Sequence, residues 1–88
     1  MYKIAYNKKV LKYIQKLKES KLDTKTKRLI EMLKLDPFKT PPPYEKLIGD
    51  LKGIYSRRIN IQHRLVYKVK EEEHIVQILS MWTHYENI

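Results

Sequence analysis

Three arginines lie close together in the second half of this chain. Arg57, Arg58 and Arg64 fall within eight positions, whereas one further arginine and fifteen lysines carry the positive charge elsewhere. The guanidinium group is planar, always ionised and able to contact a phosphate through two hydrogen bonds. The cluster therefore predicts a phosphate site, where arginines would stabilise a phosphate that gains negative charge during a reaction.

The composition around these arginines is typical of strands, so the alternation of side chains decides which of them share a face. Ser56, Arg58 and Asn60 are expected on one face. Arg57 is expected on the opposite face, near the rim, with its head in solvent and a structural or peripheral role. A tight turn would bring Arg64 across from Arg58, or diagonally near it.

Two interpretations of this pairing remain open. Two guanidinium groups at cross-strand separation repel each other, which an anion held between them would explain. In the other interpretation each arginine has a structural carboxylate partner. The residue pattern does not favour either.

The composition also indicates the class of partner. Nineteen basic and ten acidic residues give a formal charge of +9 and a pI near 9.8. Such a chain suits a nucleic acid, an acidic protein or an anionic membrane surface. It has no cysteine, and its three histidines lie in separate segments. We therefore expect no metal site and no cofactor.

The length and hydropathy predict one domain over residues 1–88. No apolar run approaches the ~18 residues of a membrane span. The start of the chain lacks the apolar stretch of a secretory signal. A cytoplasmic protein without a membrane partner is expected.

The first half of the chain has helical periodicity after a short strand at 2–6. Asn7 is a plausible N-cap for an amphipathic helix that reaches about Glu19. Its inward positions are Val10, Leu11, Ile14 and Leu17. A second helix should begin near Asp23 or Thr24, either of which can cap it, and stop before Asp36 and Pro37. Its inward positions are Leu22, Leu29, Ile30 and Leu33, with Met32 as a further candidate.

The second half of the chain begins with prolines at 41–43, which predict a stiff extended connector that delivers Tyr44 and Glu45 to a defined place. Residues 44–51 form a short element of undetermined type, ending in a turn. Strand-like composition then recurs at 54–60, 64–69 and 75–82.

This order of elements predicts an α+β fold, β-α-α-β-β-β, with a small twisted antiparallel sheet. The two N-terminal helices would pack on one face of the sheet. The other face would be open, and it is the natural place for function.

Three sequence runs resemble a known toxin family. They are GIYSRRIN at 53–60, HRLVY at 63–67 and WTHY at 82–85. Together they are similar to the YoeB/Txe branch of the RelE toxin superfamily, and segments 44–47 and 50–53 extend the resemblance over essentially the whole chain. The resemblance implies a RelE-like fold and a ribosome-dependent endoribonuclease, an mRNA interferase that cuts mRNA in the A site.

The resemblance also implies roles for particular residues. Glu45 would be the general base, Arg64 would stabilise the phosphoryl transition state, and His84 would be the general acid. Arg58 and Tyr85 would support them by binding substrate. We add Ser56 to the substrate-binding residues because it is expected on the same face as Arg58. This route of 2′-hydroxyl attack needs no metal.

The partners implied by the resemblance are an acidic antitoxin of the YefM/Phd type, the 70S ribosome and mRNA. Operator DNA would be bound only through the antitoxin, and a homodimer is compatible with the resemblance. The principal alternative is a non-catalytic basic RNA-binding module, or an inactive relative that still binds its antitoxin. A DNA-binding repressor is a weaker alternative, because no helix-turn-helix spacing is visible.

Overall fold

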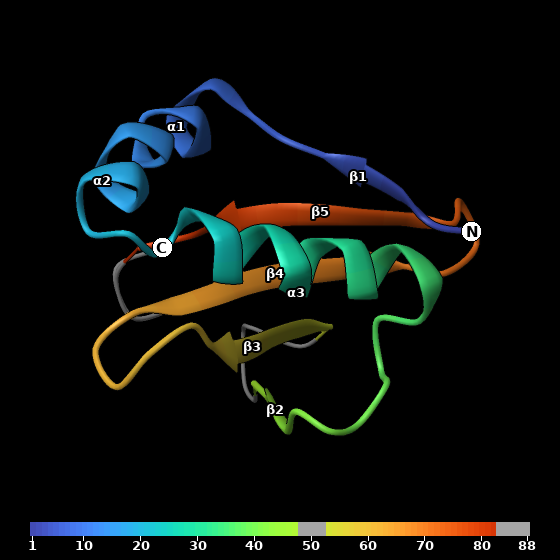
Figure 1. The fold of residues 1–88 in the computed structure, drawn as a ribbon. Coiled ribbons are helices and arrows are strands. Elements are labelled where there is room, and N and C mark those ends of the chain that lie inside the picture. Colours follow the sequence, from blue (N-terminus) through green and yellow to red (C-terminus); the bar gives the residue numbers. More distant parts are fainter. Residues whose placement is uncertain (48–52, 83–88) are drawn as a thin grey trace.

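The computed structural model describes residues 1–47 and 53–82, which form one mixed sheet with helices packed on one face (Figure 1). Figure 1 shows α3 lying across the sheet, with the short helices α1 and α2 at one end of it. The elements, in order, are β1 Lys3–Ala5, α1 Lys8–Leu11, α2 Tyr13–Glu19, α3 Asp23–Leu35, β2 Tyr44–Lys46, β3 Ile54–Arg58, β4 Arg64–Lys70 and β5 Ile75–Ser80.

The sheet has five strands in the order β1-β5-β4-β3-β2. The strands β3, β4 and β5 form the expected antiparallel meander, and β2 extends it at one edge. The first strand, β1, pairs in parallel with β5 at the other edge. The α+β class is confirmed. The sheet was expected to be antiparallel, but it is mixed, because β1 pairs in parallel with β5.

The N-terminal helical region is interrupted. Asn7 caps α1 as expected, since its side-chain oxygen accepts a hydrogen bond from the Val10 amide at 2.8 Å. The helix predicted to reach Glu19 divides at Lys12 into α1 and α2. The prediction that Asp23 or Thr24 caps the next helix is wrong: the N-cap of α3 is Leu22, which makes no side-chain capping bond.

The core lies between α3 and the near face of the sheet. Its buried residues are Val10, Leu17, Leu29, Ile30, Leu33, Ile59, Leu65, Tyr67, Val76, Ile78 and Met81. Two positions predicted to face this core, Leu11 and Ile14, are 47% and 39% exposed instead. Val10 and Leu17 occupy the inward side of the interrupted helix. Leu11 and Ile14 instead line a groove between the α1–α2 region and α3. Within residues 1–47 and 53–82, no helix has the length and apolar character needed to cross a membrane.

The proline connector leads from the end of α3 to the edge strand β2. This strand, in the region that the sequence left untyped, pairs with β3 over three residues. Glu45 lies opposite Ser56, and Tyr44 lies opposite Arg57. The connector therefore delivers Glu45 to the strand that carries two of the clustered arginines.

Candidate active site

A polar cleft forms where β2, β3 and β4 meet. It has a volume of about 480 Å³ and is lined by Lys25, Leu29, Pro42, Pro43, Tyr44, Glu45, Ser56, Arg58 and Arg64. Four of these are residues to which the sequence assigned site roles. The structure therefore brings together the expected base, the expected transition-state stabiliser and the two expected substrate-binding residues of this part of the chain.

The strand register explains how these side chains meet. Arg58 pairs directly with Arg64 across β3 and β4, and Glu45 pairs with Ser56 across β2 and β3. Directly opposed residues of an antiparallel pair point to the same face. Both pairs consequently share the face away from the core, as expected for Ser56, Arg58 and Arg64.

Asn60 takes a different position from the one expected. It lies beyond the end of β3, in the loop to β4, and its Oδ1 accepts hydrogen bonds from the amides of Gln62 at 2.8 Å and His63 at 2.7 Å. Asparagine commonly closes turns in this way. Asn60 therefore fixes the loop that sets Arg58 against Arg64.

Glu45 and Arg64 form an ion pair across the cleft. The Arg64 Nη1 lies 3.6 Å from the Glu45 Oε1, and the two side chains are 16% and 57% exposed. Because the Glu45 end of this pair is open to water, the pair contributes only about 0–1 kcal/mol. The carboxylate is held near the arginine but can exchange that contact for a substrate.

This ion pair bears on the two interpretations of the arginine pair. Arg64 does have a carboxylate partner, and that partner is the residue implied to be the general base. Among the described residues, Arg58 has no carboxylate within 4.0 Å, and it is exposed. Within residues 1–47 and 53–82, structural ion pairing therefore accounts for only one of the two guanidinium groups.

Ser56 is a buried hydroxyl on the floor of this site. It is 0% exposed, and its Oγ has no hydrogen-bond partner within the described part of the chain. A buried polar group without a partner costs free energy, on the order of 1–3 kcal/mol. Ser56 lies between Glu45 and β4 and is one of the residues that line the cleft.

Arg57 lies on the opposite face of the same strand. Its side chain is 0% exposed and packs below the proline connector. The expectation of a structural residue agrees with this burial, but the expectation that its head reaches solvent at a rim is wrong. The connector and the Tyr67 hydroxyl cover the position that the sequence pattern left open.

The end of β5 is held by an aromatic stack that the sequence did not predict. His63 stacks on Trp82 with ring centroids 3.9 Å apart, and its Nδ1 is hydrogen-bonded to the Trp82 carbonyl. The Lys16 ammonium lies 5.9 Å from the Trp82 ring centroid. Trp82 also packs against the core. The remaining predicted site residues, His84 and Tyr85, lie outside the described residues.

Lys25 of α3 was not predicted as a site residue, yet it lines the cleft with Leu29 from the same helix. Lysines of an amphipathic helix normally form a solvated face, so the sequence carries no signal that separates Lys25 from its neighbours. Only the packing of α3 beside β2 and β3 gives it this place.

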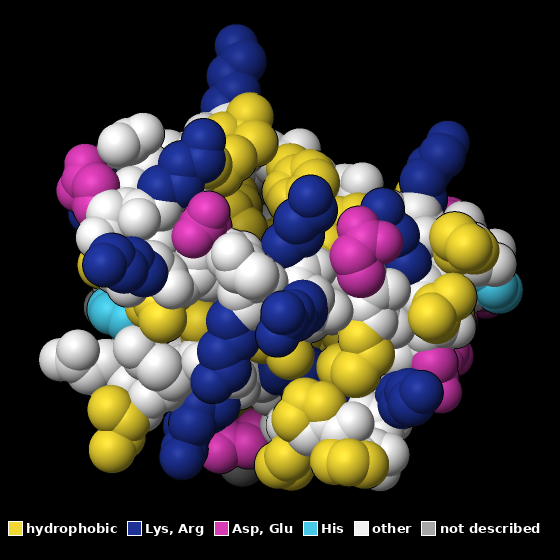
Figure 2. All heavy atoms as spheres, viewed as in Figure 1, with side chains coloured by type: hydrophobic (Ala, Val, Ile, Leu, Met, Phe, Trp, Pro, Cys, Tyr) yellow, Lys and Arg dark blue, Asp and Glu magenta, His cyan; other side chains and the backbone are white. Residues whose placement is uncertain are grey.

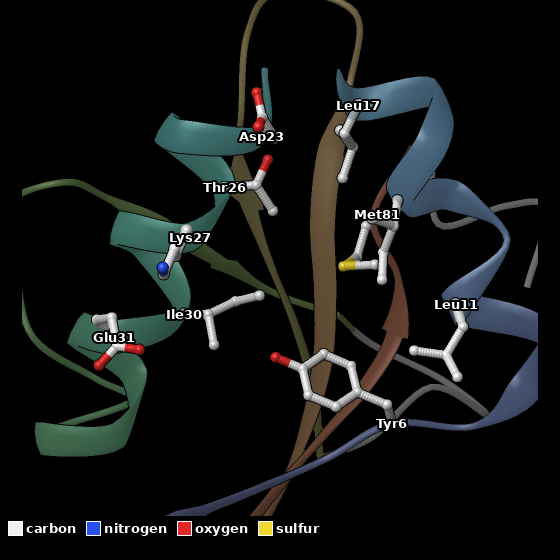
Figure 3. Close-up of a pocket in the computed structure, with 10 residues that line it drawn as sticks. Tyr6, Leu11, Leu17, Asp23, Thr26, Lys27, Ile30, Glu31 and Met81 are labelled. Atoms are coloured by element: carbon white, nitrogen blue, oxygen red, sulfur yellow. The ribbon is translucent and has the colours of Figure 1, made fainter. Parts of the chain in front are cut away.

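A second hollow, lined mainly by apolar side chains, lies between the α1–α2 region and α3 (Figure 3). Its volume is about 390 Å³. Its apolar lining is Tyr6, Leu11, Ile14, Leu17, Ile30 and Met81, and α3 adds Asp23, Thr26, Lys27 and Glu31. It contains none of the residues of the arginine cluster. Its character suits contact with another apolar surface rather than acid–base chemistry.

The mixed sheet, the helices packed against it and the arginine-lined cleft where β2, β3 and β4 meet define a small α+β protein of the RelE-like class. A family model described as the YoeB-like toxin of bacterial type II toxin-antitoxin systems matches residues 6–85. The chain therefore belongs to the YoeB-like toxins. The family predicted from the sequence is confirmed.

Individual relatives agree with this assignment. Toxin YoeB of Streptomyces coelicolor is 41% identical over 58 residues, which cover 66% of this chain and 69% of that protein. The YoeB/ParE toxin from Agrobacterium tumefaciens has a TM-score of 0.83 at 27% identity, covering 94% of this chain and 99% of that one. The YoeB-YefM complex from Staphylococcus aureus gives 0.78 at 28% identity, with coverages of 97% and 99%.

Proposed function

We propose that this toxin is a ribosome-dependent endoribonuclease that cuts mRNA in the ribosomal A site. The observation that carries the proposal is the cleft in which the Glu45 carboxylate lies beside Arg64, with Arg58 paired against Arg64 on the same face. A proton acceptor beside two phosphate-binding groups is what cleavage of RNA by its own 2′-hydroxyl requires. Membership of the YoeB-like toxins supports the same activity.

Glu45 acts as the general base. Its carboxylate accepts the proton of the ribose 2′-hydroxyl, and the 2′-oxygen forms a bond to the adjacent phosphorus. The side chain is 57% exposed, so a ribose can reach it. Exchange of the contact with Arg64 for the substrate costs little, because the ion pair is solvated.

Arg64 and Arg58 stabilise the phosphoryl group as it gains negative charge. Two guanidinium groups on one face offer donors to the non-bridging oxygens, and bidentate contacts fix the phosphate in line for attack. The phosphate also removes the repulsion between the two arginines. The Ser56 hydroxyl, buried without a partner in the described residues, donates a further hydrogen bond to the bound RNA.

His84 completes the reaction as the general acid. As the bond from phosphorus to the 5′-oxygen breaks, the imidazolium gives its proton to that oxygen. The products are a 2′,3′-cyclic phosphate and a 5′-hydroxyl, so the proton taken by Glu45 is balanced by the one that His84 releases. Tyr85 supports the site by contacting the base or the phosphate. This route uses no metal ion.

The ribosome supplies the substrate in a productive position. Figure 2 shows lysine and arginine side chains spread over the face that carries α3, and the whole chain has a formal charge of +9. Such a surface binds RNA phosphates without regard to sequence, through release of counterions. The basic surface suits contact with ribosomal RNA, while the cleft binds the mRNA. Free RNA should be cut poorly.

The test is primer extension on a message that is being translated. Wild-type protein should cut within codons at the A site, whereas Glu45→Ala, Arg64→Ala and His84→Ala should each cut at least about 100-fold more slowly. Glu72→Ala is the matched control, because Glu72 is an exposed carboxylate in the β4–β5 turn. It should cut like wild type.

Two results would overturn the proposal. Cleavage by all three variants at the wild-type rate would exclude the roles given to these residues. Binding to ribosomes by wild type without any cut would favour the alternative, a basic RNA-binding module or an inactive toxin that still binds its antitoxin.

An acidic antitoxin of the YefM/Phd type is the partner that controls this activity. The solved relative from Staphylococcus aureus is a YoeB-YefM complex. In this chain the apolar groove between α1–α2 and α3 lies among lysine-rich helices, which favours an amphipathic segment with an apolar stripe and flanking carboxylates. Such a segment would bury Leu11 and Ile14, which are exposed in the free chain.

The groove can be tested by neutralisation. Leu11→Asp should raise the amount of antitoxin needed to stop cleavage by at least about 10-fold, because it places a carboxylate in an apolar contact. Cleavage without antitoxin should not change. Ile61→Asp is the control, since Ile61 is 87% exposed and lies outside the groove. Equal neutralisation of both variants would place the antitoxin elsewhere.

A further inference from the structure

Arg57 is a buried cation, and its hydrogen-bond partners in the described part of the chain are all neutral oxygens. Its Nε donates to the Tyr67 hydroxyl at 3.0 Å, its Nη1 to the Pro42 carbonyl at 2.6 Å and its Nη2 to the Pro37 carbonyl at 3.0 Å. The Tyr67 hydroxyl donates in turn to the Pro37 carbonyl at 3.0 Å. The guanidinium lies over the Tyr44 ring, with the Arg57 Cζ 5.0 Å from the centroid of that ring.

This burial needs an explanation, because removing a charge from water is costly unless the charge is well bonded. Among the described residues no carboxylate lies within 4.0 Å of Arg57. The guanidinium instead joins three parts of the chain: both ends of the connector from α3 to β2, and the middle of β4. Its rigid fork can make all three bonds at once, which an ammonium group cannot do in the same geometry.

The connector needs an external donor of this kind. Residues 41–43 are prolines, which have no backbone N–H, so within this run only the carbonyl groups can take part in backbone hydrogen bonds. Arg57 bonds the carbonyl of Pro42, three residues before Glu45. The strand β2 that follows is only three residues long, so its own ladder holds it weakly.

Strand β3 therefore contributes to the cleft through both of its faces. Ser56 and Arg58 point into the cleft, while Arg57, between them, holds the connector that delivers Glu45. We propose that Arg57 is a positioning residue, which sets the Glu45 carboxylate against Arg64 by anchoring the proline connector. This inference rests on the proposed function, in which Glu45 is the general base.

A purely structural role for Arg57 would produce a different pattern of effects. If Arg57 acts through Glu45, its replacement should matter only while residue 45 can accept a proton. If it merely stabilises the fold, its replacement should lower the activity of any variant by the same factor. A double-mutant cycle between the two positions separates these cases.

The experiment measures single-turnover cleavage on programmed ribosomes at saturating toxin. Arg57→Lys should lower the rate about 10- to 100-fold, because a small displacement of a catalytic group is costly. In the Glu45→Gln background the same substitution should change the residual rate less than about 3-fold. Ribosome affinity should stay unchanged. Arg28→Lys, the same change at an exposed position of α3, should have no effect in either background.

Circular dichroism at the assay temperature confirms that each variant is folded. If Arg57→Lys does not fold, Tyr67→Phe takes its place, since it removes the acceptor of the Arg57 Nε and keeps the arginine. Its loss of rate should be smaller but should show the same dependence on Glu45.

Three outcomes would overturn the inference. Equal rate losses in both backgrounds would make Arg57 a stabilising residue only. An unchanged rate for folded Arg57→Lys would show that the anchor is not needed. A Glu45→Gln protein as active as wild type would remove the proposed base, and the inference with it. The first two outcomes leave the proposed function intact.

Discussion

The two faces of the β3–β4 hairpin hold arginines in opposite environments. On the core face, Arg57 is fully buried and its bonds within residues 1–47 and 53–82 go to neutral oxygens of the connector and Tyr67. On the other face, Arg58 is exposed, and Arg64 meets the Glu45 carboxylate at 3.6 Å. Arg57 and Arg58 are adjacent in sequence and identical in type, yet they have different roles.

The difference shows what makes an arginine available for chemistry. A guanidinium whose donors are already used by the protein fixes geometry, because moving it would break several bonds. A guanidinium with free donors beside a second positive charge gains most when an anion arrives. Successive side chains of a strand point to opposite faces, so two adjacent residues can have these two different environments.

The largest expected effect is on the open face. Arg64→Ala should lower cleavage about 1,000-fold on ribosomes, because it removes charge stabilisation of the transition state. Its free energy of unfolding should fall by only about 1 kcal/mol, because the Glu45 carboxylate that pairs with Arg64 is 57% exposed. Single-turnover kinetics and urea denaturation measure the two quantities. A large loss of stability would contradict the contrast between the faces.

The next effect is on the core face. Arg57→Ala should lower the free energy of unfolding by about 3 kcal/mol, because it leaves the buried acceptors of the connector without donors. Arg58→Ala, the adjacent and exposed arginine, should change it by less than about 0.5 kcal/mol. Urea denaturation of the two variants compares the faces directly. Equal losses of unfolding free energy would contradict the difference between the two faces.

The titration of Tyr67 gives a further test of the core face. Burial raises the pKa of Tyr67 to about 12, against the opposing effect of the Arg57 charge. The folded state therefore keeps this proton where the unfolded chain has lost it. Tyr67 contributes stability below pH 10 that declines between pH 10 and 12.

Tyr67→Phe should accordingly lower the free energy of unfolding at neutral pH by about 1–2 kcal/mol, since it removes a hydroxyl that is bonded on both sides. It should also flatten the decline between pH 10 and 12. Chemical denaturation at a series of alkaline pH values measures both. An unchanged slope would show that Tyr67 does not retain its proton in the folded state.

The smallest effect is expected at Ser56. Its buried hydroxyl has no partner in the described part of the chain, so Ser56→Ala should leave stability unchanged or raise it by up to about 1 kcal/mol. The concentration for half-maximal binding of programmed ribosomes should rise by up to about 10-fold, if the hydroxyl bonds RNA. Ser80→Ala, at a second buried hydroxyl without a partner there, is the matched control for stability. Loss of stability at Ser56 would reveal a structural partner.

Much of the fold could be predicted because local patterns decide it. The Asn7 cap, the end of α3 before Asp36 and Pro37, and the three strands of the meander all follow from short-range chemistry. The break at Lys12 and the exposure of Leu11 and Ile14 were missed. They depend on how two helices pack over one sheet, which periodicity in either helix does not contain.

The candidate site divides in the same way. Strand alternation was enough to put Ser56, Arg58 and Arg64 on one face, and the resemblance to a toxin family was needed to add Glu45. No pattern in the sequence could show that Lys25 lines the cleft, since it comes from a helix far away in the chain. The roles of His84 and Tyr85 remain predictions.

The sequence by itself determined the family, the α+β class and the face on which Arg58 and Arg64 meet, because these depend on motif, composition and the period of a strand. Tertiary structure alone decided that Arg57 would be sealed beneath the connector and that Glu45 would face Arg64. Those contacts join residues 15 to 20 positions apart. They form only when the end of α3, the prolines and β3 are packed together, and no local pattern encodes that packing.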